Sequence, residues 1–205
     1  MKVNRYAAIV LAAGFSNRMH FFKPLLPLGN QTMVDYLMTK FLWNGVDVFL
    51  VAGYHQDQLR AGIRTDGISI VENTSYRQGM FTSIQAGIRA LKNEYRGAFV
   101  MPVDIPLVNP ETIQILLKTT EENPGKVIHP TFQRDRGHPP LIPRELFPVV
   151  TGYAAGSNLK SVFHLYRDLE LEVEVPDNNI LFDIDEPIDY QELLERFHKT
   201  TFRKS

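Results

Sequence analysis

A short apolar strand that runs directly into a loop of small residues constrains this chain more than any other feature. Residues 6–11 form an uninterrupted apolar run, which is typical of a buried strand. The run ends at Leu11, and the small residues Ala12, Ala13 and Gly14 follow it. Such residues let backbone N–H groups approach an anion closely, and Arg18 and Lys23 add positive charge nearby. The pattern indicates a cradle for a nucleoside triphosphate, and a surface turn with two solvated cations is the alternative.

Strand-like and helix-like stretches alternate along the rest of the chain. Further buried strands are predicted at 48–52, 68–71 and 98–103, and short strands at 127–128, 169–175 and 180–184. Helices are predicted at 32–45, 56–64, 79–91, 110–122 and 144–150, from about 157, and from Pro187. This alternation favours an α/β sheet, mostly parallel, with ligands at the carboxyl ends of its strands. We expect one domain over residues 1–205.

Composition narrows the function classes. The chain has 205 residues, 44% hydrophobic and 22% charged, which is typical of a globular protein with a substantial core. A formal net charge of −1 gives no general attraction to nucleic acid or to an anionic membrane. Cysteine is absent, which excludes disulfides and thiolate metal sites. With no signal-peptide pattern and no apolar stretch of about 20 residues, we expect a cytoplasmic protein without membrane partners.

Three acidic residues are candidate metal ligands. Asp104 follows a buried strand and lies between two prolines that stiffen the backbone. A carboxylate held in this way is a natural ligand for Mg²⁺, although Asp104 could instead cap the helix that begins near Pro110. Asp183 and Asp185 follow a later apolar run, and capping of the last helix is their alternative role.

Other candidate residues lie where predicted elements begin or end. Gly53 ends the strand at 48–52, and Gly79 begins a helix whose first N–H groups would face a ligand, with Ser83 one turn later. A capped helix start without a ligand explains Gly79 equally well. Residues 132–143, rich in charge, glycine and proline, predict a shaped loop. His138 within it is a lone histidine, which more often has a structural role than a catalytic one.

Five stretches in order resemble the molybdenum cofactor cytidylyltransferase family, within the larger group of molybdopterin-guanine-dinucleotide-synthase-like nucleotidyltransferases. They are LAAGFSNRM with Lys23, NTSYRQGMFTSIQAGI, MPVDIPLV, GHPPLIP and ILFDIDEPIDY. The resemblance extends from about residue 6 to 190. One position departs from it, because His20 stands where the family usually has a glycine after Arg-Met. That glycine helps the loop wrap phosphates, so the departure predicts a reshaped loop or another nucleotide choice.

The resemblance implies a Rossmann-like three-layer sandwich of the nucleotide-diphospho-sugar transferase type. The implied reaction joins a nucleoside monophosphate, from CTP or another NTP, to molybdopterin with Mg²⁺ and releases pyrophosphate, in the maturation of a molybdenum hydroxylase. Because the acceptor phosphate is already ionised, the reaction needs cations and positioning more than a strong base. The implied catalytic residues are Arg18, Lys23 and Asp104, with Asp104, Asp185 and, less firmly, Asp183 on the metal. The implied nucleotide contacts are Leu11, Ala12, Ala13, Gly14, Gly53, Gly79 and Ser83, and His138 faces the acceptor.

Other function classes remain open from the sequence. A nucleotidyltransferase acting on a sugar or polyol phosphate would share the first loop and Asp104 but differ around His138. A non-catalytic chaperone for molybdenum cofactor insertion would bind nucleotide or molybdopterin without releasing pyrophosphate. A nucleotide-binding domain with decayed chemistry would follow if His20 disrupts the loop.

Overall fold

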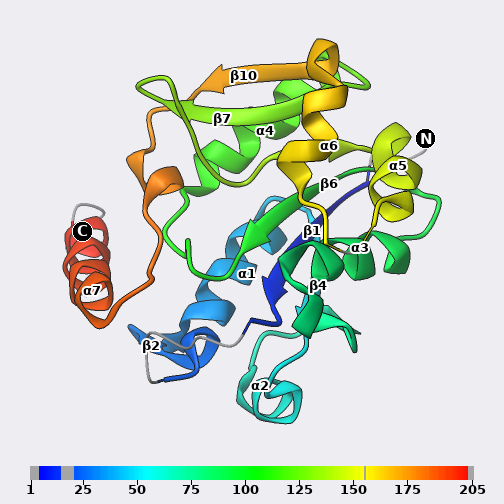
Figure 1. Ribbon diagram of the computed structural model, residues 1–205. Helices are drawn as coiled ribbons and strands as arrows, with labels where there is room; N and C mark the ends of the chain where they lie inside the picture. The colour runs from blue at the N-terminus through cyan, green and yellow to red at the C-terminus, as the bar shows by residue number, and fades with distance from the viewer. Residues whose placement is uncertain (1–4, 15–20, 155, 203–205) are drawn as a thin grey trace.

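The computed structural model describes residues 5–14, 21–154 and 156–202 and is organised around one central sheet (Figure 1). Within these residues the strand order is β10-β7-β9-β6-β1-β4-β5, with β8 beside β7. The strands are β1 (Arg5–Ala12), β4 (Asp47–Ala52), β5 (Ser69–Glu72), β6 (Tyr95–Pro102), β7 (Val127–Phe132), β8 (Asp135–Arg136), β9 (Leu141–Pro143) and β10 (Glu170–Glu174). A separate hairpin pairs β2 (Pro27–Leu28) with β3 (Gln31–Thr32).

The predicted α/β class with a mostly parallel sheet is confirmed. β1 lies parallel to both β4 and β6, β4 is parallel to β5, and β7 is parallel to β10. The α-helices are α1 (Met33–Trp43), α2 (Gln56–Gly62), α3 (Met80–Ala90), α4 (Pro110–Glu122), α5 (Phe147–Gly152), α6 (Leu159–Leu165) and α7 (Pro187–Phe202). The 3-10 turns are η1 (Lys23–Leu25), η2 (Tyr76–Gln78), η3 (Arg144–Leu146), η4 (Arg167–Leu169) and η5 (Asn178–Leu181).

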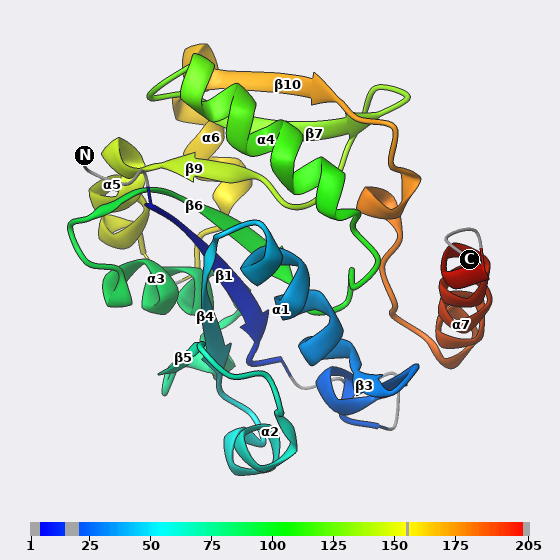
Figure 2. The same cartoon turned by 180° about the vertical axis from the view of Figure 1, so that it is seen from behind.

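Helices cover both faces of the sheet, which makes three layers. Figure 1 shows α3, α5 and α6 in front of the sheet, and Figure 2 shows α1 and α4 on the opposite face. Successive β1 side chains alternate between the two cores, so that Ile9 packs towards α3 and Val10 towards α1. Burial on both faces explains why β1 is continuously apolar rather than alternating. A Cβ on Gly87 of α3 would lie 2.3 Å from Ile9, so glycine lets this helix approach β1 closely.

Two sequence predictions in the C-terminal half are wrong. Residues 132–143 are not only a loop, because Leu141–Pro143 form β9, which is antiparallel to both β6 and β7. Two apolar residues between Pro140 and Pro143 give too little pattern to indicate a strand. Residues 180–184, predicted as a strand, do not form one. Ile180 and Leu181 end the 3-10 turn η5, at whose start the Asp177 side chain accepts a hydrogen bond from Asn179 N. A short apolar run cannot distinguish a strand from a buried turn by periodicity.

The last helix, α7, packs against β2 and the start of α1. Leu193 of α7 is fully buried in a cluster with Leu28, Met33 and Ile184. The ring of Phe197 meets Tyr36 edge-on, with 5.3 Å between centroids. The C-terminal segment is thereby fixed against β2 and α1. Among the described residues, no helix is long and apolar enough to cross a lipid bilayer.

Candidate active site

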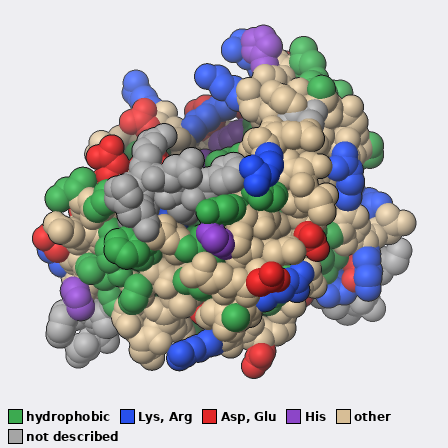
Figure 3. Space-filling view, turned by 60° about the horizontal axis from the view of Figure 1, so that its bottom comes forward, with side chains coloured by type: hydrophobic (Ala, Val, Ile, Leu, Met, Phe, Trp, Pro, Cys, Tyr) green, Lys and Arg blue, Asp and Glu red, His purple; other side chains and the backbone are tan. Residues whose placement is uncertain are grey.

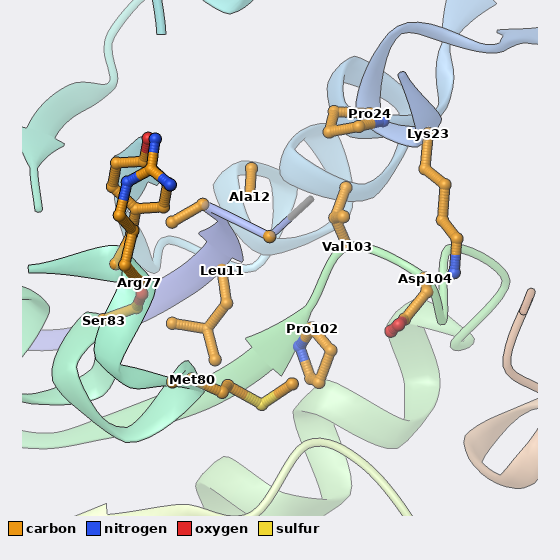
Figure 4. A pocket seen from close by; sticks show the side chains of 14 residues that line it. Leu11, Ala12, Lys23, Pro24, Arg77, Met80, Ser83, Pro102, Val103 and Asp104 are labelled. Atoms are coloured by element: carbon orange, nitrogen blue, oxygen red, sulfur yellow. The ribbon is translucent and has the colours of Figure 1, made fainter. Parts of the chain in front are cut away.

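A pocket of about 260 Å³ opens where β1 and β6 end beside the start of α3 (Figure 4). Eight residues predicted from the sequence line it, namely Leu11, Ala12, Ala13, Gly14, Lys23, Gly79, Ser83 and Asp104. They come from four separate segments that the parallel sheet brings together, and Figure 4 shows Lys23 and Asp104 at one end with Arg77 and Ser83 at the other. Arg18 and His20 lie outside the described residues, so no position is assigned to either.

Gly53 supports the wall of this pocket from behind. A Cβ at Gly53 would lie 2.8 Å from Tyr76 Cβ and 2.9 Å from Ala13 Cβ. The next residue, Tyr54, donates its backbone N–H to Ala13 O at 3.3 Å. Gly53 therefore does not line the pocket but allows β1, β4 and η2 to pack closely around it.

The amino end of α3 faces the same pocket. Gly79 has a φ of 105°, a backbone conformation that favours glycine, and no side chain caps the helix. Asn73 donates through Nδ2 to the hydroxyls of Thr82 and Ser83, both at 2.9 Å. Thr82 in turn donates to Gly79 O at 2.8 Å, so its hydroxyl is committed to the turn. The uncapped N–H groups leave partial positive charge at the pocket.

Lys23 is a buried cation, with 8% of its surface exposed. Its Nζ donates to the backbone oxygen of Ile184 and to Asp185 Oδ1, the latter at 3.1 Å. An ammonium has three N–H donors, so these two contacts leave one for another acceptor. Ile184 and Asp185, about 160 positions later in the sequence, thus orient the ammonium group of Lys23.

Asp104 is a buried carboxyl group in a mixed electrostatic environment. Burial raises its pKa to about 6, while the charge of Lys23 lowers it and the charges of Asp183 and Asp185 raise it further. Its backbone oxygen accepts a hydrogen bond from Ile184 N at 3.0 Å. The three predicted acids are therefore within electrostatic reach of one another.

The capping alternative for Asp104 is wrong, because another acid satisfies the start of α4. Asp177 Oδ2 accepts hydrogen bonds from Asn109 N at 2.7 Å and from Thr112 Oγ1 at 2.8 Å. Asp177 is buried and lies just before η5. The Asp104 carboxylate consequently remains directed at the pocket, which it lines.

Sequence reasoning missed a second buried lysine that holds the loop after Asp104. Lys40 Nζ donates to Pro106 O at 2.9 Å and to Val108 O at 2.8 Å, and it lies 4.2 Å from the centroid of the Tyr36 ring. The signal in the sequence was its place on the buried stripe of α1, beside Leu37 and Phe41. A lysine there must satisfy its charge inside the protein.

The three acids do not form a closed metal cage. Within the part of the chain that the structure describes, no three His, Asp or Glu side chains are grouped to hold a metal ion. Asp185 is paired with Lys23 at 3.1 Å. This arrangement fits Mg²⁺, which usually takes one or two carboxylates and completes its shell with substrate phosphates and water.

His138 lies away from this pocket, in the wall of a second cavity. It precedes a cis peptide bond to Pro139, and its backbone N–H donates to Ile180 O at 2.9 Å. Burial lowers the pKa of His138, against smaller raising effects from the Val100 backbone and the Asp183 charge. Its imidazole is therefore neutral near pH 7.

Comparisons with known proteins agree with this architecture. A profile of the MobA-like NTP transferase domain family matches residues 8–172. The molybdenum cofactor cytidylyltransferase of Escherichia coli K12 is 28% identical over 190 residues, which cover 92% of this chain and 95% of the relative. The "Probable molybdenum cofactor guanylyltransferase" of Carboxydothermus hydrogenoformans is 26% identical over 204 residues, with 92% and 94% covered. A Mycobacterium tuberculosis H37Rv protein solved in complex with manganese superposes with a TM-score of 0.71 at 22% identity, covering 94% of this chain and 98% of that one.

Proposed function

The chain belongs to the MobA-like NTP transferase domain family and is a nucleotidyltransferase, and we propose that its acceptor is molybdopterin. The proposed reaction transfers a nucleoside monophosphate from CTP, or from another NTP, to the terminal phosphate of molybdopterin and releases pyrophosphate. The proposal takes residues 1–205 as one transferase domain. The product would be supplied to a molybdenum hydroxylase.

One observation supports this proposal most strongly. A single pocket gathers the end of β1, the start of α3, a buried lysine and a buried aspartate from segments far apart in the sequence. Backbone N–H groups and a cation suit a triphosphate, while a carboxylate suits the cation that accompanies it. One of the two relatives is named a cytidylyltransferase and the other a guanylyltransferase, and both names contain the molybdenum cofactor. The names therefore support the proposed acceptor but not a particular nucleotide base.

We assign the following roles to the residues of the pocket. Ala12, Ala13 and Gly14 allow the triphosphate to approach the backbone, and Gly79 with Ser83 shapes the nucleoside side. Lys23 gives its remaining N–H to a phosphate oxygen and stabilises the charge that develops on pyrophosphate. Because the acceptor phosphate is ionised at neutral pH, positioning and charge replace a general base.

Asp104 is proposed to hold the divalent metal ion, and Asp185 and Asp183 would complete the site. When bound, Mg²⁺ would neutralise phosphate charge and align the reacting oxygens. The ion pair between Asp185 and Lys23 fixes the Lys23 ammonium beside the Asp185 carboxylate. The manganese complex of the mycobacterial protein supports a divalent ion in this fold.

Pyrophosphate release tests the proposal directly. The protein is incubated with each of the four NTPs, with Mg²⁺, and with molybdopterin, a sugar phosphate or no acceptor. We expect release with one NTP that depends on both molybdopterin and Mg²⁺. Release only with a sugar or polyol phosphate would identify the alternative transferase. Tight binding of molybdopterin without release from any NTP would instead favour an insertion chaperone.

A further inference from the structure

The stretch ILFDIDEPIDY contains one acid, Asp189, to which the proposed function gives no role. Asp189 lies in the first turn of α7 and is half-buried. Its Oδ2 accepts hydrogen bonds from two backbone N–H groups, those of Asp185 at 2.9 Å and Glu186 at 2.7 Å. Both groups belong to residues 184–186, the segment that leads into α7. Asp189 therefore binds the backbone of the segment that also contacts the pocket.

This segment links the two charged residues of the pocket. Ile184 N donates to Asp104 O at 3.0 Å, and Ile184 O accepts a hydrogen bond from Lys23 Nζ. The next residue, Asp185, forms an ion pair with Lys23 at 3.1 Å. Together with the two bonds to Asp189, all three N–H groups of the segment have acceptors. The place of the Lys23 ammonium thus depends on a backbone segment whose far end is held by Asp189.

Hydrogen bonds rather than burial hold the far end of this segment. Ile184 is fully buried, but Glu186 and the first two residues of α7 are exposed. Figure 3 shows hydrophobic and acidic side chains together at the surface on the left, the side on which α7 lies in Figure 1. Backbone near solvent opens easily unless its polar groups are paired. A carboxylate that accepts two N–H groups provides such pairing, and bonds of this charged kind are among the stronger ones.

The body of α7 gives Asp189 a fixed base. Leu193 is fully buried in the cluster that contains Leu28. The Tyr190 hydroxyl donates to Pro27 O at 2.6 Å. These contacts hold the helix at points that do not involve the segment before it. Loss of one of them would loosen α7 without removing a bond to that segment, which provides a control for the role of Asp189.

We infer that Asp189 is a positioning residue for nucleotidyl transfer, which fixes the Lys23 ammonium through the backbone of residues 184–186. The inference rests on the proposed function, because that function supplies the phosphates that Lys23 meets. No bond or proton changes at Asp189 itself. An ammonium that is no longer held loses its alignment with the charge that develops on pyrophosphate, which affects the transition state more than the bound substrate.

Three variants separate this role from a general contribution to stability. Asp189→Ala removes both bonds to the segment, whereas Asp189→Asn keeps an oxygen that can accept them. Tyr190→Phe removes one bond that anchors α7 and leaves the segment unchanged. Asp189→Ser, whose shorter side chain has a single oxygen, replaces Asp189→Ala if that variant does not fold. The melting temperature of each variant is measured first.

The main measurement needs no substrate. The folded protein is acetylated briefly with an N-hydroxysuccinimide ester, and peptide mass spectrometry gives the labelling rates of Lys23 and Lys40. Lys40 is also buried and is held by the loop after Asp104, so it is an internal reference. We expect Asp189→Ala to raise the labelling rate of Lys23 relative to Lys40 about tenfold, because local opening then exposes the ammonium. The ratio in Asp189→Asn and Tyr190→Phe should match the wild type.

Steady-state pyrophosphate release is the second measurement. We expect kcat of Asp189→Ala to fall about tenfold or more, with a smaller change in the KM for the NTP. Asp189→Asn should recover most of the lost rate, and Tyr190→Phe should keep the wild-type kcat.

Equal increases in the labelling of Lys23 and Lys40 would overturn the inference, because Asp189 would then act only through the stability of the fold. An unchanged kcat in Asp189→Ala, or the same loss of kcat in Tyr190→Phe, would also overturn it and leave the proposed function intact. If the wild type releases no pyrophosphate with molybdopterin but Asp189→Ala selectively exposes Lys23, the proposed function fails and the positioning of Lys23 by Asp189 stands.

Discussion

The two cavities described above, at the end of β1 and beside α6, are built from different materials. The first combines backbone and small residues at the ends of β1 and β6 with the charged Lys23 and Asp104, whereas the second is walled by side chains of α6, β7 and residues 136–140. A wall of backbone cannot be altered by exchanging side chains, so it suits a group that all substrates share, such as a triphosphate. A wall of side chains can change with the ligand. We therefore expect changes in the first cavity to affect every reaction and changes in the second to affect acceptor use.

The largest effect is expected from Asp104→Asn. It keeps the shape of the side chain but removes the charge proposed to hold the metal ion, so metal-dependent pyrophosphate release should fall about 10³-fold or more. The variant should remain folded by circular dichroism, and Asp57→Asn on exposed α2 is the matched control. Full activity of Asp104→Asn would exclude this residue as the metal ligand.

Lys23→Ala should follow, with kcat lower by about 10²–10³-fold for every accepted NTP, because one preorganised charge is lost from the transition state. Steady-state pyrophosphate release measures it, with the exposed Lys118→Ala on α4 as control. A loss of kcat with only one acceptor would assign Lys23 to acceptor use and contradict the contrast drawn between the two cavities.

A smaller effect is expected from Lys40→Met, which retains the apolar stem but leaves Pro106 O and Val108 O unsatisfied. We expect unfolding to become easier by about 1–3 kcal/mol and kcat to fall about tenfold, with a higher Mg²⁺ concentration needed for half-maximal rate. Denaturant unfolding and a Mg²⁺ titration measure these, with Lys118→Met as control. A stability loss with unchanged kcat and unchanged Mg²⁺ dependence would limit Lys40 to a structural role.

The smallest effect concerns pH and the second cavity. Burial lowers the pKa of His129 to about 4, with Arg136 adding to this and Glu170 opposing it. Since the unfolded histidine titrates near 6.5, the unfolded chain binds more protons between pH 6.5 and 4, and stability is lost as pH falls through that window. His129→Gln should therefore lose less unfolding free energy over this range than the wild type, by on the order of 1–3 kcal/mol.

Urea unfolding at several pH values measures that difference, and His164→Gln, at an exposed position of α6, serves as control. The control should follow the wild-type pH dependence. Identical slopes for all three proteins would mean that His129 is not held neutral by its surroundings.

The first cavity could largely be anticipated from the sequence, and the second could not. Local patterns such as an apolar run before Gly14, or Gly79 before a helix, identify strand ends and helix starts, and parallel strands bring these to one edge. No local pattern indicates that Lys23 binds Ile184 and Asp185, because those contacts depend on the path of the whole chain.

The errors share a physical cause. β9 is a strand because β6 and β7 provide partners on both sides, a property of its neighbours rather than of its three residues. Asp177 resembles an ordinary loop acid in sequence, and its capping role depends on α4 lying beside it in space. Contacts between segments far apart in the sequence thus determined the strand β9 and the role of Asp177, which sequence periodicity does not indicate.

The contact between Lys23 and residues 184–185 has a consequence for synthesis. A ribosome makes the chain from its amino end, so Lys23 and Asp104 emerge well before Ile184 and Asp185, which contact them. The family profile itself ends at residue 172, before that contact is made. A nascent chain stopped there would have the first loop but not the ion pair between Lys23 and Asp185. Synthesis of residues 184–185 is thus the step that allows the Lys23 ammonium to be held in place.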